Sequence, residues 1–185
     1  KVEPMMELGM ISMHEGAVER ALEMLGEALN ITRQIGNSGQ EMRVLGPIGT
    51  AHTQLGEHTK ARDCLTRSID ISRRIGDRHV EAQRLGQLAL SWANIGQFEE
   101  AIALYEESLE VAEQLGAKKV MNFCLGSLGN IYKKIGQFDL ALERNTKALA
   151  LSKETGAKRS TVVQLGNLGE VHRITGNVDL ALEYH

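Results

Sequence analysis

The sequence contains two cysteines and six histidines, the residue types that most often bind metals or act as nucleophiles. Zinc sites need ligands at short spacings such as CxxC or HExxH, and a nucleophilic cysteine needs a histidine oriented beside it. Neither zinc motif occurs, and Cys64 and Cys124 lie far apart in the sequence. We therefore expect no metal, no cofactor and no enzymatic activity. We interpret both cysteines as small core residues in a reducing, cytoplasmic compartment.

Glycines three residues apart, such as Gly126 and Gly129, are a second pattern that could carry chemistry, because glycine-rich loops bind phosphate. A phosphate loop follows a strand and ends in GK[ST], and the sequence has no such ending. We place these glycines inside helices, where each costs about 0.5–1 kcal/mol relative to alanine. We expect that this cost is offset because a neighbouring helix backbone approaches closely.

The glycines recur with a period of 40 residues, which identifies a repeat array. We expect one elongated array of about four and a half repeats. Because the last repeat is cut short, we expect a fragment of a longer protein. The expected repeats are residues 1–36, 37–76, 77–116, 117–156 and 157–185.

Each repeat is expected to form two antiparallel helices, because apolar residues recur at three- and four-residue steps and the intervening turns are very short. In the second repeat the helices are expected at about residues 38–55 and 57–75. The glycine after each helix suits a left-handed C-terminal cap. Pro47 lies inside the first of these helices, so we expect a kink there or a helix that starts late.

The overall charge excludes some classes of partner. A net charge of −3 and a pI near 6.1 give no general attraction to nucleic acid. The sequence has no apolar run near the roughly 18–20 residues that span a bilayer. We therefore expect neither nucleic acid nor membrane as a partner.

Residues 125–156 carry a family resemblance. They resemble the tetratricopeptide repeat in a 40-residue form that is similar to Pins/LGN-type and bacterial regulator arrays, although the usual unit has 34 residues and a helix-ending proline. The resemblance implies an all-α, right-handed superhelix, or α-solenoid. The matching positions are Leu125, Leu128, Gly129, Tyr132, Ala141 and Ala148.

The resemblance also implies that the first helix of each repeat lines a concave groove where partners bind. The groove-facing positions are counted from the small residue of each repeat, such as Gly129. The predicted partner-binding residues are Arg43, Gln83, Asn94, Phe123, Asn130, Lys133, Lys134, Glu170 and Arg173.

Charge is unevenly distributed, and two interpretations stay open. Residues 97–115 carry six glutamates and no lysine or arginine, whereas residues 117–135 carry four lysines. The two helices could pair weakly on a solvated face, at about 0–1 kcal/mol for each pair. Alternatively, the C-terminal half forms a basic half-groove for an acidic segment.

We therefore expect a protein-interaction scaffold that binds a peptide or helical segment, acidic toward the C-terminal half, in its groove. The alternative is a sensor module that regulates a catalytic or DNA-binding domain elsewhere in the parent protein. Self-association through an open C-terminal end is a further option.

Overall fold

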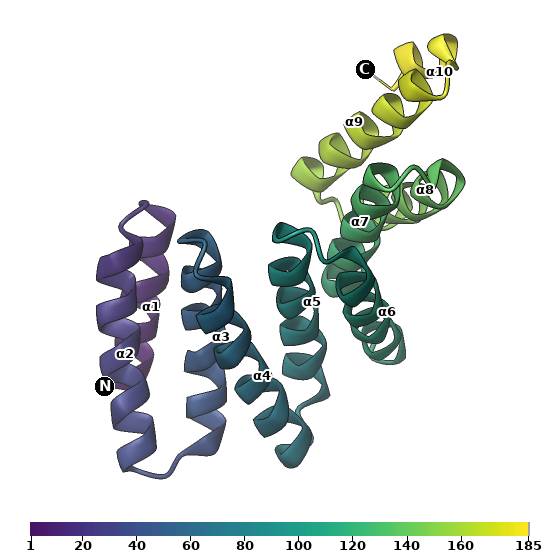
Figure 1. Cartoon of the computed structure of the whole chain (residues 1–185). Coiled ribbons are helices and arrows are strands. Elements are labelled where there is room, and N and C mark those ends of the chain that lie inside the picture. The colour runs from purple at the N-terminus through teal and green to yellow at the C-terminus, as the bar shows by residue number, and fades with distance from the viewer. Residues whose placement is uncertain (185) are drawn as a thin grey trace. The chain divides into compact units, whose positions relative to one another are not determined.

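The computed structural model describes residues 1–184, and all regular structure in that range is α-helical (Figure 1). The helices pack as consecutive pairs, which confirms the predicted all-α helix-turn-helix repeats. They are α1 (Val2–His14), α2 (Val18–Gln34), α3 (Ser38–Gln54), α4 (His58–Ile75), α5 (Arg78–Asn94), α6 (Phe98–Gln114), α7 (Lys118–Lys134), α8 (Phe138–Glu154), α9 (Lys158–Ile174) and α10 (Val178–Glu183).

The chain divides into two compact units. The N-terminal unit spans Lys1–Gln97 and contains α1 to α5, and the C-terminal unit begins at Phe98 and contains α6 to α10. In each unit the core is built from aliphatic side chains and small residues, because alanines at the helix contacts let the helices approach. Leu25 and Leu65 are fully buried in the N-terminal unit, as are Tyr105 and Leu128 in the C-terminal unit.

Glycines end the helices as predicted. Nine glycines at the 20-residue spacing from Gly16 to Gly176 have φ between +62° and +83°, the left-handed region that costs glycine least. At Gly76, φ is +77°, and the next backbone N–H, of Asp77, donates to the Ser72 carbonyl at 2.9 Å. This hydrogen bond satisfies a carbonyl that the helix end would otherwise leave free.

The helices α3 and α5 of the N-terminal unit begin with a side-chain cap, whereas α7 and α9 of the C-terminal unit do not. Asn37 accepts a hydrogen bond from the Gln40 N–H at 2.9 Å, and Asp77 accepts one from the Val80 N–H at 3.0 Å. In the C-terminal unit, α7 and α9 begin after Ala117 and Ala157, which have no side-chain acceptor.

We expect Asn37→Ala to lower the free energy of unfolding by about 1 kcal/mol, because it removes the side-chain acceptor at the start of α3. The converse change, Ala117→Asn, supplies such an acceptor to α7 and should raise it by about 0.5–1 kcal/mol. Urea denaturation followed by circular dichroism measures both. If both substitutions changed the free energy of unfolding in the same direction, side-chain capping would not control the stability of these helix N-termini.

Pro47 does not delay its helix. The helix α3 is continuous from Ser38 to Gln54, so the predicted late start is wrong, whereas the kink stays a prediction. Two features explain why the helix begins early. Asn37 caps its first turn, and the residues on both sides of Pro47 are buried, including Leu45 and Ile48. Tertiary packing offsets the backbone hydrogen bond that proline cannot make.

The glycines inside the helices are held by packing, but against side chains more than backbone. A Cβ on Gly49 would lie 2.7 Å from Leu65 Cγ and 3.3 Å from the Ala61 carbonyl oxygen. A Cβ on Gly129 would lie 2.5 Å from Asn145 Oδ1. We expected the backbone of a neighbouring helix to approach these glycines, and this is wrong in the main, because the nearest atoms at Gly49 and Gly129 belong to side chains. At Gly166 a Cβ would meet no atom within 4 Å, so close packing does not explain every glycine.

Candidate functional site

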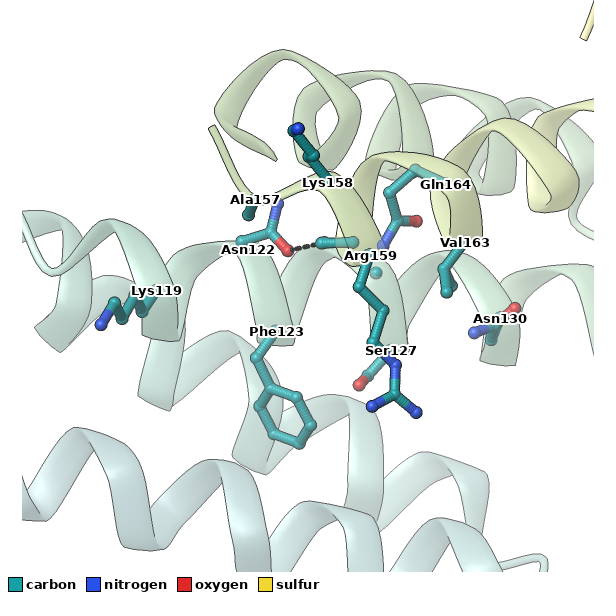
Figure 2. A pocket seen from close by; sticks show the side chains of 12 residues that line it. Lys119, Asn122, Phe123, Ser127, Asn130, Ala157, Lys158, Arg159, Val163 and Gln164 are labelled. Carbon is teal, nitrogen blue, oxygen red and sulfur yellow. Dashed lines mark hydrogen bonds between the residues drawn. The ribbon is translucent and has the colours of Figure 1, made fainter. Parts of the chain in front are cut away.

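A groove lies between α7 and α9, both in the C-terminal unit (Figure 2). Its volume is about 620 Å³. Both helices are first helices of their repeats, the helices expected from the sequence to line a groove. We call the hollow between them the α7–α9 groove. It is lined by Lys119, Asn122, Phe123, Gly126, Ser127, Asn130, Ala157, Lys158, Arg159, Ser160, Val163 and Gln164.

The charge that lines the α7–α9 groove has one sign. Lys119, Lys158 and Arg159 are exposed at the N-terminal ends of the two helices, and no acidic residue lines the groove. Within residues 1–184 none of the three has an ion-pair partner, whereas the adjacent Lys118 pairs with Glu154 at 2.5 Å. These three cations are therefore available to a negatively charged ligand.

Apolar side chains occupy the middle of the groove. Phe123 is 40% exposed and Val163 is 49% exposed, although both are large hydrophobic residues. The ring of Phe123 meets the fully buried Tyr105 edge to face, with 5.9 Å between the centroids. Tyr105 therefore supports part of the Phe123 ring, labelled in Figure 2, while 40% of the residue stays exposed. A rigid, half-exposed ring suits an apolar ligand group.

The wall of the groove is polar and ordered. Ser160 donates a hydrogen bond to Asn122 Oδ1 at 2.5 Å, drawn dashed in Figure 2, and Asn122 Nδ2 donates to the Ala148 carbonyl at 2.6 Å. Gln164 is only 5% exposed, and its Oε1 accepts from Asn167 Nδ2 at 3.4 Å. These contacts hold α9 against α7 and α8 and set the side chains that face the groove.

The predicted residues of the C-terminal unit fall into two groups. Phe123 and Asn130 line the α7–α9 groove. Lys133, Lys134, Glu170 and Arg173 lie further along the same helices, outside the lining. The Lys133 ammonium pairs with the Glu170 carboxylate and lowers its pKa, and Lys134 lies 5.8 Å from the ring centroid of Phe98. Two of the three cations predicted here, Lys133 and Lys134, therefore already interact with other side chains of the chain.

Three predicted residues belong to the N-terminal unit. Arg43 on α3 donates to Glu3 at 2.8 Å, while Gln83 is half-buried and Asn94 is exposed on α5. A hollow of about 620 Å³ in this unit lies elsewhere, among α2, α3 and α4. Arg33 and Arg67 line that hollow, but both pair with Glu41, at 3.0 and 2.8 Å. The free positive charge of the α7–α9 groove is therefore not repeated there.

Sequence reasoning missed Lys119, Arg159 and Gln164. A signal for Lys119 existed, because residues 119, 123, 127 and 130 follow one stripe at three- and four-residue steps along α7. Arg159 occupies the matching position one repeat later. Gln164 had no such signal, since its place in the groove depends on how α9 packs on Gly126.

Comparison with known proteins defines the class. The tetratricopeptide repeat model matches residues 2–74, 40–114 and 81–154, so the chain belongs to the tetratricopeptide repeat family. No curated protein sequence matches it. No described helix has the length and apolar character that a membrane span requires.

Three solved structures share the fold. BtubC from P. vanneervenii superposes with a TM-score of 0.86 at 21% identity, over 99% of this chain and 76% of that one. A Pyrococcus horikoshii signal transduction ATPase with a tetratricopeptide repeat sensor superposes with a TM-score of 0.85 at 19% sequence identity, over 97% of this chain and 28% of that one. The apo form of the quorum sensor NprR from B. thuringiensis superposes with a TM-score of 0.84 at 19% sequence identity, over 100% of this chain and 51% of that one. These matches do not confirm the narrower Pins/LGN-type resemblance.

Proposed function

We propose that the chain is a non-catalytic protein-interaction module that binds a peptide or helical segment of its partner in the groove lined by the first helices of its repeats. The observation that carries this proposal is the α7–α9 groove. It combines a half-exposed aromatic ring, Phe123, with three cations that have no described partner and no acid among its lining residues. Unpaired charge beside exposed apolar surface is typical of a binding site.

Site-specific photo-crosslinking tests the proposal. A photoreactive phenylalanine analogue replaces Val163 in the groove or, as the matched control, Ala150, which is exposed on α8. In native lysate we expect at least about a tenfold higher yield of a crosslinked partner from position 163, because a bound segment contacts that side chain. Excess unmodified chain should abolish the crosslink. Equal yields from the two positions, or a higher yield from position 150, would contradict groove binding.

The residues predicted further along the helices are tested in the same assay. Lys133→Glu, Lys134→Glu and Arg173→Glu together reverse three charges outside the groove lining. If the bound partner extends along α7 and α9 beyond the groove lining, these substitutions reduce the crosslink from position 163. An unchanged yield would limit the binding site to the α7–α9 groove.

A regulatory sensor is the second candidate. Two solved structures of the same fold carry the word sensor in their names. One is the Pyrococcus ATPase with its tetratricopeptide repeat sensor, and the other is the quorum sensor NprR. At this level of identity they support the fold, and the sensor function is our extension of it. A sensor should change its radius of gyration when the captured segment is added, which small-angle scattering measures. A scaffold should keep the same value.

A further inference from the structure

The α7–α9 groove offers a ligand three kinds of group: cations at one end, the apolar side chains Phe123 and Val163 beside them, and the amide of Gln164. From these we infer the class of its ligand: an extended peptide segment of about five residues, with carboxylates at one end and an apolar side chain next to them. The carboxylates face Lys119, Lys158 and Arg159, and the apolar side chain lies against Phe123 and Val163. This inference rests on the proposed function and names the ligand that the function requires.

The positive end of the groove is unfavourable for the protein without a ligand. Helix N-termini carry a partial positive charge, which acidic residues in the first turn complement. The first turns of α3 and α5 carry such residues, Glu41 and Glu81. In α7 and α9 the first turns instead carry Lys118, Lys119, Lys158 and Arg159, with no acid and no side-chain cap. A bound carboxylate would interact favourably with both helix ends and with the three unpaired cations.

The size of the groove sets the length of the segment. Lys119 and Asn130 mark its two ends on α7. At about 1.5 Å per residue of helix, they are separated by roughly 16 Å along the axis. An extended peptide rises about 3.3 Å per residue, so about five residues cover this distance.

Gln164 gives the groove a fixed hydrogen-bond donor between these ends. Its amide lies directly over Gly126, because a Cβ there would be 2.6 Å from Gln164 Nε2. Its Oε1 accepts from Asn167, whose Nδ2 also reaches the buried Asn145 Oδ1 at 3.5 Å. Asn167 occupies Oε1, whereas Nε2 of this groove-lining side chain has no acceptor among the described residues and can donate to a main-chain carbonyl of the ligand. Main-chain contacts of this kind hold an extended peptide without selecting its side chains.

Selection from a phage-displayed library of random dodecapeptides tests the inference without requiring that the partner be identified. Such peptides carry no phosphate, so enriched aspartate or glutamate identifies carboxylate as sufficient. We expect enriched peptides with at least two acidic residues beside an aliphatic or aromatic one. Synthetic copies should bind at least about tenfold more weakly to Arg159→Glu, and binding should weaken as salt is raised.

Two further variants separate recognition from damage to the fold. Lys153→Glu makes the same charge change at an exposed position of α8 and should alter affinity less than about twofold. Gly126→Ala displaces the Gln164 amide and should weaken peptides of every sequence by a similar factor, because it removes a main-chain contact. Circular dichroism confirms unchanged helicity in each variant.

The outcomes are distinct. Enrichment of peptides without acidic residues, or equal binding by Arg159→Glu, would overturn the inference and leave the groove as a peptide site. If no peptide is enriched and position 163 gives no preferential crosslink, both the inference and the proposed function are wrong. Acidic, apolar peptides that lose affinity with Arg159→Glu but not with Lys153→Glu would establish the ligand class.

Discussion

Gly49→Ala should lower the free energy of unfolding by about 2 kcal/mol, although alanine is the better helix former. The new Cβ would lie 2.7 Å from Leu65 Cγ and 2.9 Å from Leu65 Cδ2. Leu65 is fully buried, and its branch point cannot rotate away as a flexible side-chain end could. Overpacking of this kind costs up to about 3 kcal/mol, and the gain in helix propensity returns about 1 kcal/mol.

A matched glycine in the same unit provides the control. Gly26 lies within α2, and a Cβ there would meet no atom within 4 Å. Gly26→Ala should therefore raise the free energy of unfolding by about 0.5–1 kcal/mol, from helix propensity alone. Chemical denaturation of the two variants beside the parent chain measures the difference. If both variants change stability in the same direction, contact with Leu65 is not what selects glycine at position 49.

The repeat period allowed the helices to be predicted closely, because each signal was local. The second repeat was expected at about residues 38–55 and 57–75, and its helices are Ser38–Gln54 and His58–Ile75. The positive φ at the turn glycines was equally predictable from sequence, since only glycine adopts it without strain. Pro47 was misread in part, because its local preference is overridden by the burial of its neighbours.

The candidate site was less predictable, because it depends on contacts between repeats. Sequence placed Phe123 and Asn130 on the groove-facing stripe, and both line the α7–α9 groove. It could not show that Lys133 is engaged by Glu170, which lies 37 residues further along the chain. Nor could it show that Lys119 and Lys158 are without such a partner among the described residues. Ion pairing between repeats decides which cations are available, and it becomes visible only when the helices are packed.

Arg84 illustrates the same limit in the N-terminal unit. Its guanidinium lies over Gly46, with Cζ 2.0 Å from where a Cβ of Gly46 would be. Burial lowers the pKa of Arg84 to about 10, and the charge of Asp77 opposes this shift. Nη1 donates to Gln87 at 2.9 Å, but Nε has no hydrogen-bond partner among the described residues. A largely buried cation with an unsatisfied donor destabilises the folded chain.

We therefore expect Arg84→Met to raise the free energy of unfolding by about 2 kcal/mol at neutral pH, because it replaces a buried charge by an apolar chain of similar length. Gln87 is half-buried, so its freed oxygen can accept a hydrogen bond from water. The matched control is Arg20→Met at an exposed position of α2, which should change stability by less than about 0.5 kcal/mol.

The pH dependence of this gain has a definite sign. The pKa of Arg84 is about 10 in the folded chain, below its ordinary value of 12.5, so the unfolded chain binds more protons between these values. The cost of burying the charge is therefore complete below pH 10 and decreases as the pH rises further. The stability difference between Arg84→Met and the parent chain should be constant from about pH 6 to 9 and should shrink above pH 10. Urea denaturation across this range measures it, and a difference that falls between pH 6 and 9 would assign the effect to another titrating group.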